Sequence, residues 1–244
     1  RMTATKFKNG YIYKVTPSET FSIHYVPAWT GEDIHDVYKR ISNTWGRGKP
    51  AFLFNAELYN TNTMKPASSV VEKGKVHAMF EGHGIAFIDN KKPVWSYKNN
   101  VNAPDYIGVY PTLVRNGKRD LKSDPAGLGG SRGRTAIATD KDGNFYICLV
   151  ADGNNDATLR EVADALLKAG ATDGGNLDGG GSTQWYAPNG KHYTGRRVRG
   201  YIAVWLNEVV DNHTEPTLDI RTVAVRTSLN VRDNPSLFGR VIDR

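Results

Sequence analysis

The sequence contains a single cysteine among its 244 residues, which excludes a framework of disulfide bonds within the chain. That residue, Cys148, stands in the apolar run FYICLV, and we expect it to be a small residue of the core. No apolar run approaches the roughly 20 residues that span a bilayer, and the first residues, RMTATKFKNGYIYK, lack the apolar stretch of a signal peptide. We therefore expect no transmembrane segment.

Motifs of several common enzyme and binding classes are also missing. The histidines form neither an HExxH nor an HxH pair, which argues against a zinc hydrolase. No glycine-rich segment has the spacing of a Walker loop or of a dinucleotide-binding fingerprint. The formal charge of +7 favours an anionic partner, but lysine and arginine are spread along the chain. No RNA-binding or helix-turn-helix signature occurs, so we do not expect nucleic-acid binding.

Short β-type runs make up most of the sequence. The segments DNKKP, RNGK, DKDGN and PNGK separate some of them and carry the Asn, Asp and Gly residues typical of hairpin turns. The runs predicted as strands are 11–15, 21–26, 51–56, 76–80, 84–89, 106–114, 134–140, 144–151 and 201–206.

Two stretches have the apolar period of a helix. In the first, Thr30 is the predicted N-cap of the segment GEDIHDVYKRISNTW. In the second, Thr158 and Glu161 form a capping box, and Gly170 ends the helix. Many strands with two principal helices predict an α+β fold on a large, mainly antiparallel or mixed β-sheet.

Composition changes near the end of the chain and suggests a domain boundary. Residues 1–206 are predicted to form one domain, and the polar segment NEVVDNHTEPTLD at 207–219 to form a linker. The β-rich tail at 220–244 has 25 residues, fewer than the roughly 40 that usually fold alone. We therefore expect the tail to dock on the main domain, to pair with another copy of the chain, or to be a truncated piece of a second domain.

A glycine-rich basic loop precedes one of the predicted strands, in the segment GLGGSRGRTAIATD at 127–140. Arginine offers a fork of donors that matches phosphate or carboxylate oxygens. Arg134 opens the strand and would be held by it, so we predict a catalytic or anion-binding role for it. Arg132 is predicted with equal weight to be a solvated loop residue or a ligand of the anion.

Two aspartates follow predicted strands. Asp152 follows the strand NFYICLVA, and the chain returns through the second helix and the segment AGATDGGNLD to Asp178. A strand, a helix and a further strand can bring two strand ends to the same edge of a sheet, where both side chains would be neighbours. The alternative is that Asp152 is only a turn former before Gly153.

The segment GGGST after Asp178 can turn the chain with several N–H groups pointing one way, which forms a nest for an anion. The residues predicted to bind phosphate here are Gly179, Gly180, Gly181, Ser182 and Thr183. His83, in the segment EGHG, is a weaker candidate for substrate binding, because a turn histidine is the favoured explanation of this residue.

The ordered set of motifs YPTLVRNGK, RTAIATDKDGNFYICLVADG and TLREVADALLKAGATDGGNLDGGGSTQWY resembles the phosphodiester glycosidase family over roughly residues 50–206. The segment FLFNAELYN stands where the family has an Asn followed by small residues, which implies that Asn55 lies in the pocket. Glu57 occupies a place where the family has a small residue. This departure concerns the substrate pocket, in which Glu57 is itself a predicted substrate-binding residue. The tail TSLNVRDNPSLFGRVI resembles the start of a bacterial SH3-like repeat.

The family resemblance implies a hydrolase that releases a sugar from a sugar-1-phosphodiester. Such a leaving group is a stable anion, so the site needs positive charge at the phosphate and a carboxylate near the anomeric carbon. We expect Asp178 to activate water or to stabilise the transition state, Asp152 to orient the water or bind hydroxyls, and Arg134 to bind phosphate.

The resemblance of the tail points to a bacterial or phage protein that acts on an envelope glycopolymer, outside the cell or in its envelope. No cofactor is expected to be required. A divalent cation, Mg²⁺ or Ca²⁺, stays open because Asp152, Asp178 and Asn176 offer oxygens. The alternative function is a non-catalytic module that binds anionic cell-wall glycopolymer, which the departure at Glu57 favours.

Overall fold

The computed structural model describes residues 1–16, 21–87, 92–98, 102–206, 231–232 and 241–242. The chain divides into two compact units, Arg1–Glu208 and Val209–Arg244. In the second unit, the described strands β18 (Val231–Arg232) and β19 (Val241–Ile242) pair antiparallel. The predicted linker at 207–219 lies outside the described residues, and the SH3-like character of the tail stays a prediction. Within the described part of the chain, no helix is long and apolar enough to cross a membrane.

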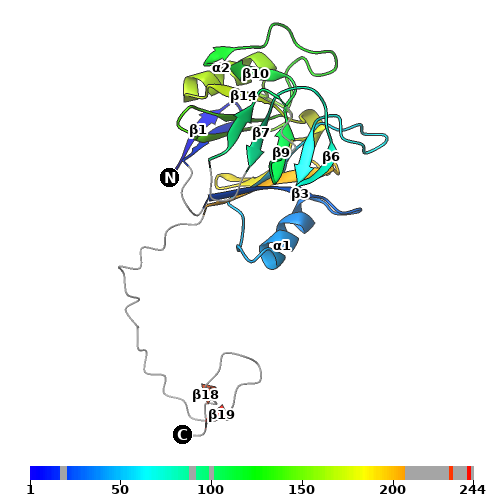
Figure 1. Cartoon of the computed structure of the whole chain (residues 1–244), viewed down its shortest axis with the longest axis vertical. Coiled ribbons are helices and arrows are strands. Elements are labelled where there is room, and N and C mark those ends of the chain that lie inside the picture. Colours follow the sequence, from blue (N-terminus) through cyan, green and yellow to red (C-terminus); the bar gives the residue numbers. More distant parts are fainter. Residues whose placement is uncertain (17–20, 88–91, 99–101, 207–230, 233–240, 243–244) are drawn as a thin grey trace. The chain divides into compact units, whose positions relative to one another are not determined.

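A seven-stranded sheet forms one layer of the first unit (Figure 1). Its strands, in spatial order, are β1 (Met2–Phe7), β2 (Gly10–Val15), β13 (Phe145–Val150), β12 (Arg134–Thr139), β14 (Asp173–Asn176), β10 (Thr112–Arg115) and β11 (Lys118–Arg119). All neighbours in this sheet pair antiparallel. The predicted α+β fold with a mainly antiparallel β core is confirmed.

Two five-stranded sheets complete the β core. The first has the order β16 (Gly190–His192), β15 (Trp185–Ala187), β4 (Phe52–Asn55), β17 (Gly200–Leu206) and β3 (Phe21–Pro27). The second has the order β6 (Lys75–Ala78), β5 (Val70–Glu72), β9 (Asp105–Gly108), β7 (Gly84–Phe87) and β8 (Val94–Ser96). Ile137 of β12, Phe54 of β4 and Ile107 of β9 belong to one buried cluster, so all three sheets face the same interior.

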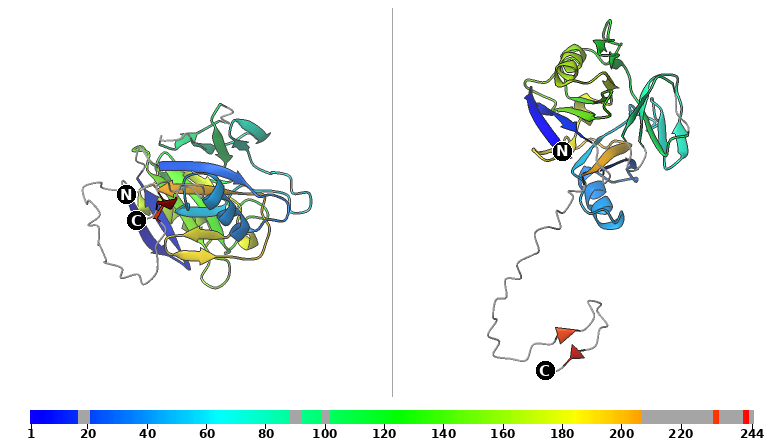
Figure 2. Two further views of the ribbon diagram at one scale, coloured as in Figure 1. Left: turned by 90° about the horizontal axis from the view of Figure 1, so that it is seen from below. Right: turned by 60° about the vertical axis from the view of Figure 1, so that its left-hand side comes forward.

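The two helices cover different sheets and lie at opposite ends of the first unit (Figure 1 and the right-hand view of Figure 2). Helix α2 (Leu159–Ala169) packs on the face of the seven-stranded sheet that carries Ala136 and Cys148. Helix α1 (Ile34–Thr44) packs on Leu53 and Tyr201 of the sheet that contains β4. The prediction that Cys148 is a core residue is confirmed, because its side chain is buried beneath α2.

Helix α2 begins and ends as the sequence predicts. The Thr158 hydroxyl accepts from the Glu161 N–H at 3.2 Å, and the Glu161 carboxylate accepts from the Thr158 N–H at 2.9 Å. Gly170 ends the helix with a positive φ of 102°, where glycine avoids the strain of a Cβ atom.

Loss of the N-cap hydroxyl is expected to weaken α2. Thr158→Ala leaves the Glu161 N–H without its side-chain acceptor and is expected to lower the free energy of unfolding by about 1 kcal/mol. For a domain of this size, that corresponds to a Tm lower by about 3 °C in a thermal melt. Thr158→Ser keeps the hydroxyl and should have the same Tm as the protein without a substitution. An equal decrease of Tm in both variants would contradict the capping role.

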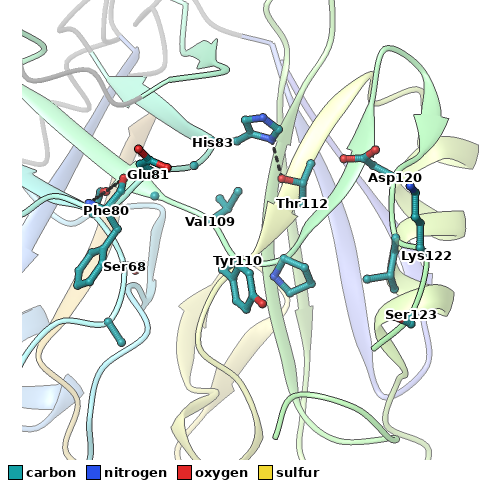
Figure 3. A pocket seen from close by; sticks show the side chains of 16 residues that line it. Ser68, Phe80, Glu81, His83, Val109, Tyr110, Thr112, Asp120, Lys122 and Ser123 are labelled. Carbon is teal, nitrogen blue, oxygen red and sulfur yellow. Dashed lines mark hydrogen bonds between the residues drawn. The ribbon is translucent and has the colours of Figure 1, made fainter. Parts of the chain in front are cut away.

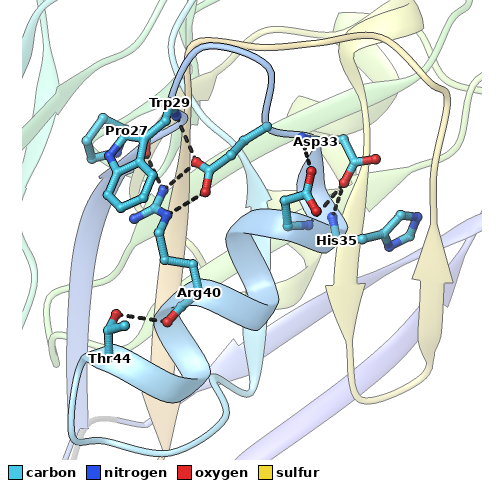
Figure 4. A network of polar contacts seen from close by, with 8 residues as sticks. Pro27, Trp29, Asp33, His35, Arg40 and Thr44 are labelled. Carbon is cyan, nitrogen blue, oxygen red and sulfur yellow. Dashed lines mark hydrogen bonds and ion pairs between the residues drawn. The ribbon is translucent and has the colours of Figure 1, made fainter.

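The predicted start of α1 is wrong, because Asp33 and not Thr30 is its N-cap. The Asp33 Oδ1 atom accepts from the N–H groups of His35 and Asp36 at 2.8 and 3.0 Å (Figure 4). Gly31 has a φ of 92° and turns the chain between Thr30 and the helix. The sequence pattern identified the apolar face of α1 but not this turn.

The run 106–114, predicted as one strand, is two strands in different sheets. Strand β9 ends at Gly108, and β10 begins at Thr112 in the seven-stranded sheet. The chain crosses between the sheets at 109–111, so the apolar pattern continues across the break. This crossing places Tyr110 beside β14, where Tyr110 N–H donates to the Asn176 carbonyl at 2.9 Å.

Candidate active site

The candidate site lies at one edge of the seven-stranded sheet. Strands β13 and β14 both pair antiparallel with the intervening β12, so they run parallel to each other and end at the same edge. Asp152 follows β13 and Asp178 follows β14, while Arg134 opens β12 at this edge. These three side chains line one cavity of about 450 Å³, which we call the edge cavity. The structure therefore brings together residues that stand 44 positions apart in the chain.

The edge cavity is polar, and three arginines and two aspartates line it. Its lining residues are Gly127, Leu128, Ser131, Arg132, Arg134, Asp152, Asn176, Asp178, Gly179, Gly180, Gly181 and Arg196.

The carboxyl group of Asp178 has a shifted pKa. Burial raises the pKa of Asp178 above its ordinary value, although a hydrogen bond from Ser182, another from the Gly179 N–H and the charge of Arg196 oppose this shift. The Gly179 N–H lies 3.0 Å from Asp178 Oδ1. A carboxylate with a raised pKa is a stronger base than an ordinary aspartate, which suits proton abstraction.

Arg196 is a cation of the cavity that our sequence analysis missed. Its Nη1 atom donates to Ser182 Oγ at 3.4 Å, and its carbonyl accepts from Gln184 Nε2 at 2.8 Å. Gly181 makes room for the guanidinium, because a Cβ atom there would lie 3.0 Å from Arg196 Nη2. The basic run GRRVRG before β17 was the available signal, but it does not show which arginine faces Asp178.

Arg132 and Arg134 donate hydrogen bonds to the loop that lines the cavity. Arg134 is 1% exposed, and its Nε and Nη2 atoms donate to the carbonyls of Ala157 and Gly130 at 2.9 and 2.5 Å. Burial, reinforced by the charge of Arg132, lowers the pKa of Arg134 to about 10. Arg132 donates to the carbonyls of Gly127 and Gly129 at 3.1 and 2.5 Å. Arg134 remains a cation near neutral pH, and both guanidinium groups line the cavity.

Asp152 is exposed and is tied to the same loop. Its Oδ1 atom accepts from the Gly133 N–H at 2.6 Å, immediately before Arg134. A Cβ atom at Gly133 would lie 2.9 Å from Thr183 Oγ1 and 3.0 Å from Asp152 Cβ, so the three residues are closely packed. The position of Asp152 in the cavity agrees with an orienting role, which stays a prediction.

The glycine-rich turn offers fewer free amides than a nest would. Gly179 N–H donates to the Asp178 carboxylate and Gly180 N–H donates to the Gly133 carbonyl at 2.8 Å. The N–H groups of Ser182 and Thr183 donate within the turn, and both side chains are buried. Among the groups that line the edge cavity, the arginine side chains are therefore better suited to an anion than the amides of the turn, and phosphate binding by residues 179–183 stays a prediction.

Asn55 supports the site through hydrogen bonds to its backbone. Its side chain is buried; Oδ1 accepts from Thr135 Oγ1 at 2.7 Å and from the Gln184 N–H at 3.2 Å. Its Nδ2 atom donates to the Asp178 carbonyl at 2.7 Å. Asn55 thus fixes the backbone that carries the Asp178 carboxyl group, and direct contact with substrate stays a prediction.

Glu57 and His83 lie apart from the edge cavity. Glu57 Oε1 accepts from the Tyr25 hydroxyl at 2.7 Å and from Arg199 Nε at 3.2 Å, and burial raises its pKa. His83 Nδ1 lies 2.7 Å from Thr112 Oγ1 in a second cavity, and burial lowers its pKa. Their predicted roles in substrate binding are not tested by this placement.

Metal ligation was left open by the sequence. Asp152, Asp178 and Asn176 all line the edge cavity and carry oxygens that suit Mg²⁺ or Ca²⁺. Over the residues that the structure describes, no group of three or more His, Cys, Asp or Glu side chains is arranged to hold a metal ion. Metal dependence stays a prediction that an activity assay with a chelator would decide.

The profile of phosphodiester glycosidases matches residues 49–205, which include the edge cavity and both helix α2 and strand β14. The chain belongs to the phosphodiester glycosidase family. Membership favours a hydrolase that acts on a sugar-phosphate substrate. No match was found among curated protein sequences.

Two solved structures share the fold of this family member. The catalytic domain of zebrafish N-acetylglucosamine-1-phosphodiester α-N-acetylglucosaminidase, auto-inhibited by its pro-peptide, is 14% identical with a TM-score of 0.65. The match covers 85% of this chain and 83% of the zebrafish chain. A hypothetical protein from Synechocystis is 15% identical with a TM-score of 0.64, and the match covers 83% of this chain and 61% of that chain.

Proposed function

We propose that the edge cavity hydrolyses the bond between the anomeric carbon of a sugar and the phosphate of a sugar-1-phosphodiester. The observation that supports this most strongly is the placement of Asp178, whose pKa is raised, in a cavity that three arginines also line. The products are the free sugar and a phosphomonoester.

The arginines supply the charge that this leaving group requires. The departing phosphate monoester is already an anion and needs little protonation of its bridging oxygen. Arg196, Arg132 and Arg134 surround the cavity with fixed positive charge, which stabilises negative charge that develops on the phosphate in the transition state. Two of these arginines are held by backbone carbonyls, so little reorganisation is needed during the reaction.

Asp178 acts as the base toward water in this proposal. The carboxylate accepts a proton from water while the water oxygen bonds to the anomeric carbon, and the electron pair of the breaking carbon–oxygen bond leaves with the phosphate. The proton then passes to solvent. Asp152 positions the water or the sugar hydroxyls through the loop that it holds at Gly133.

The substrate that we propose is a bacterial or phage-targeted envelope glycopolymer, and the place of action is outside the cell or in its envelope. The formal charge of +7 supports attraction to such an anionic polymer. The resemblance of the tail to a bacterial SH3-like repeat supports the same setting.

Hydrolysis of a simple ester tests the proposal. The protein is expected to release N-acetylglucosamine and methyl phosphate from the methyl phosphodiester of α-N-acetylglucosamine-1-phosphate, the sugar being taken from the name of the zebrafish relative. Because the pKa of Asp178 is raised, the acid limb of kcat/KM should lie above the ordinary range of an aspartate.

Binding of the ester or of a wall glycopolymer without product release would contradict the enzyme and support a non-catalytic binding module. Glu57 prompted that alternative. Among the described residues, Glu57 is not one of those that line the edge cavity.

A further inference from the structure

A second cavity of about 610 Å³ lies beside the edge cavity, along the same edge of the seven-stranded sheet. Strand β10 pairs with β14, so the residues that precede β10 lie next to those that follow β14. Tyr110 lines the second cavity and Asn176 lines the edge cavity. Two hydrogen bonds join Tyr110 and Asn176, and the Asn176 N–H also donates to the Pro111 carbonyl at 3.0 Å. We call this second cavity the Tyr110 cavity.

One loop contributes to both cavities. Residues 120–123 line the Tyr110 cavity, and Gly127, Leu128 and Ser131 from the same loop line the edge cavity. A ligand that extends from the edge cavity toward β10 therefore passes along one continuous loop and across the Tyr110–Asn176 contact.

Two exposed aromatic residues line the Tyr110 cavity. Tyr110 is 53% exposed and Phe80 is 47% exposed. Figure 3 shows both side chains among those that line the cavity. The backbone of Phe80 is fixed by Ser69, whose Oγ accepts from the Phe80 N–H at 2.8 Å and lies 3.0 Å from the Phe80 carbonyl. Exposed aromatic faces provide stacking surfaces for a ligand, and here the backbone of both residues is fixed by hydrogen bonds.

The polar groups of the Tyr110 cavity suit a neutral ligand with many hydroxyls. Glu81 and Asp120 lie on opposite walls in Figure 3, with Lys122 beside Asp120. Asp120 also accepts from Arg115 at 2.9 Å. Carboxylates on both walls disfavour a second phosphate, whereas they accept hydrogen bonds from hydroxyl groups.

We propose that the Tyr110 cavity binds the group on the far side of the phosphate, a sugar or polyol unit that leaves with the phosphomonoester. This inference rests on the proposed function, because it extends the same substrate beyond the edge cavity. The sugar to be released lies at Asp178, the phosphate lies among the arginines, and the leaving unit stacks on Tyr110. The site is thereby suited to a polymer in preference to a simple phosphodiester.

A third cavity of about 410 Å³ provides a matched control. It is lined by Trp29, which is 62% exposed and stacks on the Arg40 guanidinium at 4.0 Å, and by Arg197 and Arg199. Trp29 is an exposed aromatic ring like Tyr110, but it follows β3 in a different sheet.

The test compares two esters of α-N-acetylglucosamine-1-phosphate, one with methanol and one with a disaccharide. Tyr110→Ala is expected to lower the ratio of kcat/KM for the disaccharide ester to that for the methyl ester by about tenfold. Phe80→Ala, on the opposite wall, should lower the same ratio in the same direction. Trp29→Ala should leave the ratio unchanged.

An unchanged ratio in both Tyr110→Ala and Phe80→Ala, or a lower ratio in Trp29→Ala alone, would overturn the Tyr110 cavity as the leaving-group site. If the unchanged protein hydrolyses neither ester, the proposed function fails. In that case, the Kd of the disaccharide ester is measured for the unchanged protein and for Tyr110→Ala. A higher Kd in Tyr110→Ala would support binding in the Tyr110 cavity, and equal Kd values would overturn it.

Discussion

Asp178→Asn is expected to lower kcat/KM for the methyl ester of α-N-acetylglucosamine-1-phosphate by about a thousandfold. Asparagine keeps the size of the side chain and an oxygen for the Gly179 N–H, but it cannot take a proton from water. Steady-state kinetics with a thermal melt of the same sample would measure the loss and show that the fold is kept.

Asp164→Asn is the matched control for this substitution. Asp164 lies on α2 with its side chain 54% exposed, where it pairs with Arg119, so this variant should retain activity within about twofold. Asp152→Asn should lose less activity than Asp178→Asn, because Asp152 acts through the loop at Gly133. A larger loss at Asp152 would reverse the roles that we assign to the two carboxylates.

Arg196→Met is expected to lower kcat/KM for the same ester by about a hundredfold. Methionine keeps part of the side-chain volume beside Gly181 but removes the charge that faces the phosphate. The neighbouring Arg197 lines the third cavity, so Arg197→Met is a control of equal charge change and should retain most of the activity. Equal losses in the two variants would show that overall charge, and not the position of Arg196, matters.

The pH profile gives an independent readout of Arg196. Its charge lowers the pKa of Asp178 against the larger effect of burial, so its removal should raise that pKa further. Activity requires the ionised carboxylate and is lost as the pH falls through this pKa; hence the acid limb of Arg196→Met should lie at higher pH than that of the unchanged protein. An acid limb at the same pH in both proteins would show that the charge of Arg196 does not affect the pKa of Asp178.

Local signals in the sequence were sufficient for several elements. The capping box of Thr158 and Glu161 and the terminal Gly170 correctly define α2, because caps depend on residues close in sequence. The succession of strand, helix and strand also predicts that Asp152 and Asp178 meet at one edge, and both line the edge cavity.

Features that depend on distant segments were not predictable in this way. The break at Tyr110 arises because β9 and β10 join different sheets, which the apolar pattern of one segment does not encode. Arg196 lies in the segment between β16 and β17, and its side chain donates to Ser182. Its neighbours in the basic run are also arginines, so residue type alone does not identify the one in the cavity. The amides of the glycine-rich turn find their acceptors partly at Gly133, which lies 47 positions before Gly180 in the chain.

Hydrolysis in water enriched in ¹⁸O tests most directly whether the edge cavity cleaves the bond at the anomeric carbon. Attack by water on that carbon leaves all original oxygens on the phosphate, so ³¹P NMR of the methyl phosphate should show no isotope shift. Attack on phosphorus would place one ¹⁸O atom in the phosphorus-containing product and produce that shift. An unlabelled methyl phosphate would confirm a glycosidase, and a labelled phosphorus-containing product would contradict it.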